Sequence, residues 1–75
     1  MKWHAQHDQS RLRFEILTEE FFTRDGKENI IYYTLYVYNG DQCTHDYQQE
    51  TLEAAQNTAK EFFNVPDAAW TIVSP

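Results

Sequence analysis

The longest apolar pattern in the chain runs from residue 30 to residue 38. Nearly all of these side chains are β-branched or aromatic, the types that pack best on a pleated sheet. The odd positions are more aliphatic than the even positions, which indicates a strand with two different faces. Asn39-Gly40 follows directly, and Asn-Gly after such a run is a strong signal for a hairpin turn. We therefore expect a central strand here.

A second strand is predicted upstream, because residues 11–16 alternate between polar and apolar side chains. Asp25-Gly26 supplies a turn between the two strands. With a two-residue loop at that turn, Ile16 lies opposite Leu35 and both face the core. The other face then carries a row of large side chains: Leu17, Phe21, Ile30, Tyr32, Tyr36 and Tyr38.

A third strand is predicted over residues 42–48, but its orientation depends on the turn before it. A two-residue loop at Asn39-Gly40 would turn Asp46 toward the core. A three-residue loop places Cys43, His45 and Tyr47 there instead. Burying a carboxylate without a partner costs more than accepting a bulged turn. We therefore expect the odd-length loop and an inaccessible Cys43.

A helix is predicted over residues 51–64. The Thr51 hydroxyl can accept a hydrogen bond from a free N–H group of the first turn. Asn64 suits the left-handed position at the end, and Pro66 prevents continuation. The spacing predicts an apolar stripe that faces the sheet, made of Leu52, Ala55, Ala59 and Phe62.

The two ends of the chain carry weaker patterns. Residues 1–10 are polar and aperiodic, which indicates a flexible tail with Trp3 as its only anchor. Residues 65–75 suggest a turn and a short strand with Trp70 and Ile72 inward, or else a packed tail anchored by Trp70. The expected fold is one α+β domain over residues 1–75. A three-stranded antiparallel meander (residues 11–49) is packed on one face by a single helix.

The chain has 75 residues and a formal net charge of −6, with twelve acidic and six basic side chains. After Gly40 only Lys60 opposes six carboxylates. Such a charge distribution repels nucleic acid and anionic membranes and suits a basic protein partner. Cys43 is the only cysteine, so no internal disulfide can form. Without an apolar signal segment or a membrane-spanning run, we expect a cytoplasmic protein.

The last third of the chain resembles a group of small bacterial proteins in which one helix follows an antiparallel sheet. The resemblance rests on Thr51-Leu52-Glu53-Ala54-Ala55, then Phe63-x-Val65-Pro66, and on Trp70 downstream. It implies the sheet-and-helix fold and a bacterial origin. It implies no activity and transfers no functional residues.

Two groups of side chains have residue types that can carry chemistry. His4 and His7 have a spacing that can bind a metal on a helix, but nothing in residues 1–10 predicts one. Cys43, His45 and Asp46 suggest a nucleophile, a base and an orienting carboxylate. On a strand, however, Cys43 and His45 lie about 6–7 Å apart and Asp46 points to the opposite face. We expect no catalytic residue, no metal and no cofactor.

The uncovered face of the sheet is the best functional candidate. Tyrosine is enriched at protein interfaces, where the ring becomes dry and the hydroxyl stays wet. We therefore predict a non-catalytic protein-binding or self-associating domain. The alternative is a small enzyme, or a protein that binds a small molecule, with a site around His45 and Cys43. The residues predicted for the interface are Leu17, Phe21, Tyr32, Tyr36 and Tyr38.

Overall fold

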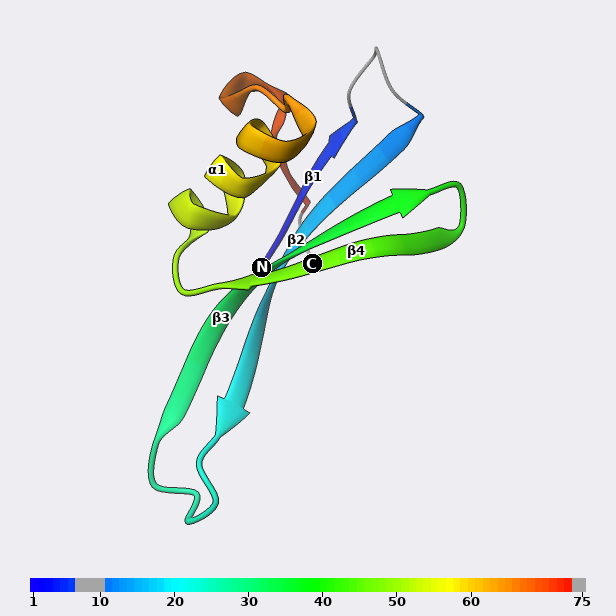
Figure 1. Ribbon diagram of the computed structural model, residues 1–75. Coiled ribbons are helices and arrows are strands. Elements are labelled where there is room, and N and C mark those ends of the chain that lie inside the picture. The colour runs from blue at the N-terminus through cyan, green and yellow to red at the C-terminus, as the bar shows by residue number, and fades with distance from the viewer. Residues whose placement is uncertain (7–10, 74–75) are drawn as a thin grey trace.

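The computed structural model describes residues 1–6 and 11–73 and shows one helix packed on an antiparallel sheet (Figure 1). The α+β class is therefore confirmed. The sheet has five strands in the order β4-β3-β2-β1-β5, so the predicted three-stranded meander is wrong in its number of strands. The elements are β1 (Lys2–Gln6), β2 (Leu12–Phe22), β3 (Asn29–Asn39), β4 (Gln42–Gln49), α1 (Leu52–Phe63), the 3-10 helix η1 (Asp67–Ala69) and β5 (Thr71–Val73).

Strand β1 occupies the segment that was predicted to be a flexible tail. It lies between β2 and β5 and pairs with both of them. Trp3 and Ala5 are buried in the core, whereas Lys2 and His4 point to the other face. A strand with only two apolar residues gives a weak local pattern. Its stability comes from pairing with neighbours that are distant in the sequence.

The register predicted for β2 and β3 is confirmed. Ile16 lies opposite Leu35, and Phe14 lies opposite Val37. The connecting loop is longer than expected, because the Thr23 N–H donates to the Glu28 carbonyl at 2.9 Å and encloses residues 24–27. Gly26 has a φ of +70°, a conformation that glycine adopts at little cost. The longer loop keeps the register because it takes one residue from each strand, residue 24 from one side and residue 27 from the other.

The turn between β3 and β4 differs from the prediction. Asn39 pairs with Gln42, so the loop has two residues. A bulge between Val37 and Tyr38 shifts the pairing of β3 with β4 by one residue, the shift that was expected from a three-residue loop. Beyond the bulge His45 lies opposite Val37, on the helix side as expected. Cys43 lies opposite Tyr38 and is exposed. The prediction that Cys43 is inaccessible is therefore wrong, because the bulge reverses the alternation between Cys43 and His45.

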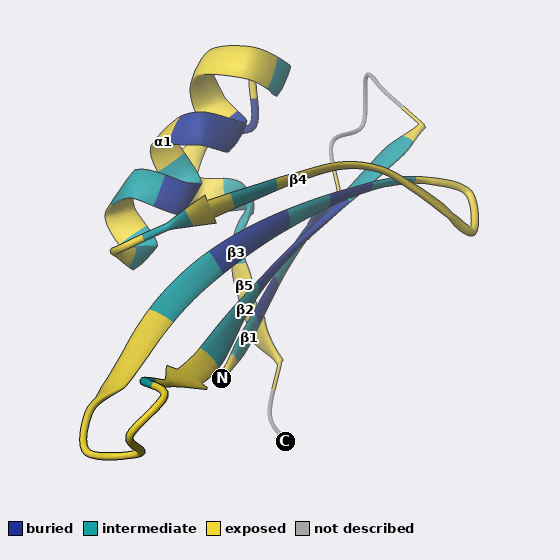
Figure 2. Cartoon of the chain, turned by 60° about the horizontal axis from the view of Figure 1, so that its bottom comes forward, coloured by how far each residue is buried: buried dark blue, intermediate teal, exposed yellow. Residues whose placement is uncertain are grey.

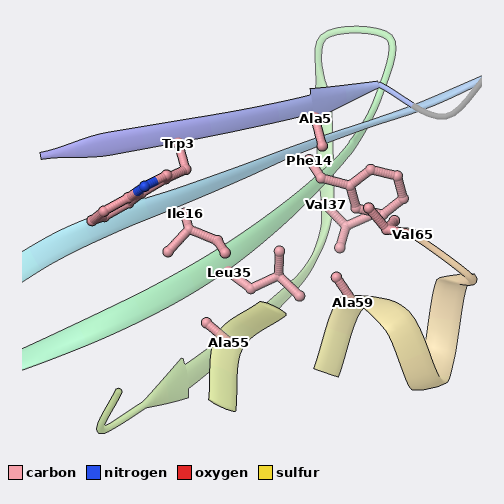
Figure 3. Close-up of a cluster of buried hydrophobic side chains, with 9 residues drawn as sticks. All are labelled: Trp3, Ala5, Phe14, Ile16, Leu35, Val37, Ala55, Ala59 and Val65. Atoms are coloured by element: carbon pink, nitrogen blue, oxygen red, sulfur yellow. The ribbon is translucent and has the colours of Figure 1, made fainter. Parts of the chain in front are cut away.

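Helix α1 begins and ends as predicted. The Ala54 N–H donates to the Thr51 hydroxyl at 3.0 Å, and Asn64 takes the left-handed conformation with a φ of 59°. Phe62, predicted to face the sheet, is 63% exposed. Phe63 packs against the core instead, with its ring 5.5 Å from that of Phe14. Figure 3 shows the buried cluster: Trp3, Ala5, Phe14, Ile16, Leu35, Val37, Ala55, Ala59 and Val65.

The C-terminal segment forms the short strand β5, which pairs with β1. Trp70 packs against the core as predicted. Ile72 lies opposite Trp3 but is exposed, because β5 is the edge strand of the sheet. The expected burial of Ile72 is therefore wrong. No helix within the described residues has the length and apolar character that a membrane crossing needs.

The hairpin of β2 and β3 extends beyond the rest of the molecule (Figures 1 and 2). The pairing of β1 with β2 ends at Leu17, and the pairing of β4 with β3 ends at Tyr33. Residues 19–32 therefore form a two-stranded projection, which we call the arm. The molecule is accordingly elongated, with extents of 46 × 25 × 24 Å.

Candidate functional site

The five residues predicted for the interface lie on the face of the sheet that α1 leaves uncovered. Cross-strand pairing fixes this placement, since Leu17 lies opposite Thr34 and Phe21 opposite Ile30 on the side away from the core. Tyr32, Tyr36 and Tyr38 follow at alternate positions of β3. The structure thus brings all five together on one face, and they divide into an inner and an outer group.

The inner part of this face is organised around the buried carboxylate of Glu15. Lys2 Nζ lies 3.1 Å and Arg13 Nη1 3.3 Å from Glu15 Oε1. The Arg13 guanidinium also lies over the Tyr38 ring, 4.6 Å from its centroid. Two cations therefore balance the carboxylate, and a cation–π contact orders one of them. This part of the face is a self-contained polar network.

Tyr36 lies beside the inner group, with its ring 6.5 Å from that of Tyr38, and its hydroxyl donates to Glu19 Oε1 at 2.6 Å. This hydrogen bond, together with burial and the negative charge of Glu19, raises the pKa of Tyr36 to about 12. Burial, followed by the charge of Glu15, raises the pKa of Tyr38. Both phenols remain protonated at neutral pH, and that of Tyr36 acts as a hydrogen-bond donor.

The outer group lies on the arm and has a different character. The rings of Phe21 and Tyr32 meet edge to face at 5.7 Å. Phe21 and Ile30 are each 44% exposed on the uncovered face. Phe22 is 67% and Ile31 51% exposed on the opposite face, the face that α1 covers further along the strands. The arm therefore presents large apolar side chains on both of its faces. Most of the arm is coloured as exposed in Figure 2.

Phe22 and Ile31 were not among the predicted interface residues, because the register places them on the face that packs against the helix further along the strands. The signal for their exposure was the difference in length between the elements. A helix of 12 residues is about 18 Å long, whereas a strand of 11 residues spans about 36 Å. One helix of this length cannot cover the whole hairpin.

The residues of the predicted alternative site do not come together. Cys43 lies opposite Tyr38 on the uncovered face, whereas His45 lies opposite Val37 on the helix side. The only bond between them runs from Cys43 Sγ to the His45 backbone carbonyl, at 3.5 Å. The His45 ring is stacked on Tyr47, with centroids 6.2 Å apart. No nucleophile and base are therefore paired here.

Only one of the two histidines near the N-terminus lies within the described residues. His4 lies on β1 opposite Glu15, and His7 lies outside the described residues. Among residues 1–6 and 11–73, no three potential ligands gather closely enough to hold a metal ion.

Comparisons with protein-family models, with curated proteins and with solved structures found no match to this chain. The resemblance to small bacterial sheet-and-helix proteins therefore stays a prediction.

Proposed function

We propose that this chain is a non-catalytic protein-binding domain whose contact surface is the arm. One observation carries the proposal. A two-stranded ribbon that projects from the body exposes large apolar side chains on both faces: Phe21, Phe22, Ile30 and Ile31. An isolated hairpin is only marginally stable in water, and contiguous exposed apolar side chains mark contact sites.

The tyrosines of the uncovered face fit into the same surface in two roles. Tyr32, at the inner end of the arm, and Leu17, just beyond it, continue the apolar surface toward the body. Tyr36 and Tyr38 are already engaged with Glu19 and Arg13, so they form a polar rim at its inner end. An apolar centre bordered by a polar rim is the usual anatomy of a protein interface.

Charge and cysteine chemistry support the choice of partner and compartment. With a net charge of −6 the chain has little with which to attract phosphate groups, which favours a protein over a nucleic acid. Cys43 is an exposed free thiol, and such thiols persist in reducing compartments. We accordingly propose a cytoplasmic location.

A photo-crosslinking amino acid at position 22 tests the proposal in the native cell. The matched control is the same amino acid at position 62, because Phe62 is 63% exposed on α1 and Phe22 is 67% exposed on the arm. We expect discrete crosslinked protein species from position 22 and none from position 62. Equal crosslinking from both positions, or none from position 22, would contradict a binding surface on the arm.

A further inference from the structure

Both edges of the arm have unpaired backbone groups. On the β2 side, the last bond to the N-terminal segment runs from the Thr18 N–H to the Met1 carbonyl, at 3.1 Å. On the β3 side, pairing with β4 ends where Tyr33 meets Gln49. No described residue pairs with either outer edge of the arm beyond these points. A bare edge of this kind is a template for another strand.

The backbone hydrogen bond between Thr23 and Glu28 determines which N–H and C=O groups of the arm point away from the hairpin. In an antiparallel ladder, hydrogen-bonded and non-hydrogen-bonded pairs alternate. Because the Thr23 N–H donates to Glu28, the pair of Phe21 and Ile30 is also bonded across the hairpin. The residues whose backbone N–H and C=O groups point away from the hairpin therefore belong to the intervening pairs. They are Glu20 and Phe22 on the β2 edge, and Asn29 and Ile31 on the β3 edge.

The two edges differ in how they are protected. The β2 edge carries the carboxylates of Glu19 and Glu20, which accept hydrogen bonds from the Tyr36 hydroxyl and from Asn29 Nδ2 of β3. Charged side chains are the usual device that keeps an edge strand from pairing. The β3 edge reads Asn-Ile-Ile-Tyr-Tyr-Thr over residues 29–34, without a charge, a proline or a glycine. Such a segment has the composition that favours strand-to-strand association. Of the two edges, β3 is the one open to a partner.

We propose that the β3 edge of the arm pairs with the β3 edge of a second copy of this chain, antiparallel and about a two-fold axis. This inference rests on the proposed function and names the partner. Asn29 then lies opposite Ile31 of the second copy, and Ile30 lies opposite its own equivalent. This register uses the outward N–H and C=O groups of Asn29 and Ile31 in both copies. The two arms become one four-stranded sheet.

The side chains of the two copies are complementary in this register. The Ile30 and Phe21 side chains form one apolar row across the four strands, because paired residues share a face. Glu28 comes level with Tyr32 of the second copy, whose hydroxyl can donate to it. Asp25 is already engaged in its own loop, since its carboxylate accepts from Thr23 Oγ1 and from the Lys27 N–H.

Charges at the ends of the paired arms are also complementary. The tip of each arm carries Arg24 and Lys27. It reaches the point where β4 of the other copy ends beside Tyr33. Glu50 and Glu53 follow there, around the start of α1. Opposite charges of this kind set register and orientation at an interface. They favour a second copy even though each chain is acidic overall.

Proline substitutions distinguish the two edges. Ile31→Pro removes an N–H that the single chain does not use, and proline is tolerated where the N–H faces outward from an edge. Glu20→Pro is the matched control, because Glu20 pairs with Ile31 at the same level of the arm and its backbone N–H points to the other edge. This substitution also removes the carboxylate that accepts from Asn29 Nδ2, so the control is the more severe of the two changes to the arm. In sedimentation velocity on the full chain, we expect dimers for wild type and Glu20→Pro. For Ile31→Pro we expect at least a tenfold rise in the dissociation constant with an unchanged circular dichroism spectrum.

A disulfide test reads the register directly and does not depend on the proline variants folding well. In a Cys43→Ser background, Ile30→Cys places two thiols opposite each other, with Cα atoms about 4.5 Å apart. Phe21→Cys is the control, because Phe21 and Ile30 are both 44% exposed and adjacent but Phe21 lies away from the shared edge. We expect oxidation to give a covalent dimer with Ile30→Cys and not with Phe21→Cys.

Three outcomes would overturn the inference: a monomeric wild type at all concentrations, dissociation by Glu20→Pro rather than Ile31→Pro, or equal crosslinking of the two cysteine variants. A monomeric wild type whose position 22 still crosslinks a different protein would overturn the second copy as partner. It would leave the arm as a binding surface.

Discussion

The two ends of the β2–β3 ladder belong to the same strands and keep one register, yet their environments are opposite. Near the body, Phe14, Ile16 and Leu35 are completely buried under α1, and β1 and β4 flank the ladder on either side. In the arm, Phe22 and Ile31 occupy the same face and are exposed. Pairing into a ladder therefore does not by itself bury side chains. Burial requires a second layer, and here that layer is shorter than the strands.

Truncating one phenylalanine at each end of the ladder should give the largest difference in the free energy of unfolding. Phe14→Ala removes a fully buried ring that packs on Phe63, and should lower the free energy of unfolding by about 3–5 kcal/mol. Phe22→Ala removes an exposed ring and should cost less than about 0.5 kcal/mol in the single chain. Urea denaturation followed by circular dichroism at low protein concentration measures both. Similar losses would mean that the arm is part of the core.

Thr34→Val tests the buried part of the ladder and should make the protein more stable. Thr34 is buried, and no described residue forms a hydrogen bond with its Oγ1 atom. An isosteric methyl group removes that unpaired hydroxyl, so we expect the free energy of unfolding to rise by about 1 kcal/mol. Thr58→Val is the control, because the Thr58 hydroxyl donates to the Ala54 carbonyl and accepts from Gln49 Nε2. That variant should lose about 1 kcal/mol. A loss for Thr34→Val would show that its hydroxyl has a partner.

The smallest effect concerns the bond between Tyr36, in the body, and Glu19, the first residue of the arm. The pKa of Tyr36 is raised from 10.0 to about 12, so the folded state favours the protonated phenol. Its stabilising contribution is complete below pH 10 and is lost as the pH rises through about 12. Glu19→Gln should bring this pKa back toward 10, measured by ultraviolet absorbance with Tyr36→Phe to identify the signal. An unchanged titration would mean that Glu19 does not hold the phenol.

Elements with strong local signals could be predicted from the sequence. The alternation in β2, the β-branched run in β3 and the Asp-Gly turn were enough to place Ile16 opposite Leu35. The limits of the helix followed from two residues. The Thr51 side chain accepts a hydrogen bond at the start of α1, and the left-handed conformation of Asn64 ends it. The placement of the interface residues on the uncovered face followed in turn, because register determines face.

Features that depend on distant contacts could not be predicted. β1 has little intrinsic preference for a strand and is held by the two strands that it pairs with. The bulge at Val37 and Tyr38 has no glycine to signal it, and it turned Cys43 away from the core. Phe62 and Phe63 satisfy the helical repeat almost equally well, and only the packing of Phe63 on Phe14, a residue distant in the sequence, distinguishes them.

The position of β1 between β2 and β5 has a consequence for the order of folding. Lys2 pairs with Val73, so this contact closes a loop of almost the whole chain, whereas β2, β3 and β4 are joined by short turns. The entropic cost of closing a loop rises with the length of the loop, so contacts between residues distant in the sequence form slowly. We expect the three central strands and α1 to assemble first and the pair of β1 and β5 to form last. Amide groups of β5 should then exchange with solvent through openings that leave the rest of the sheet folded.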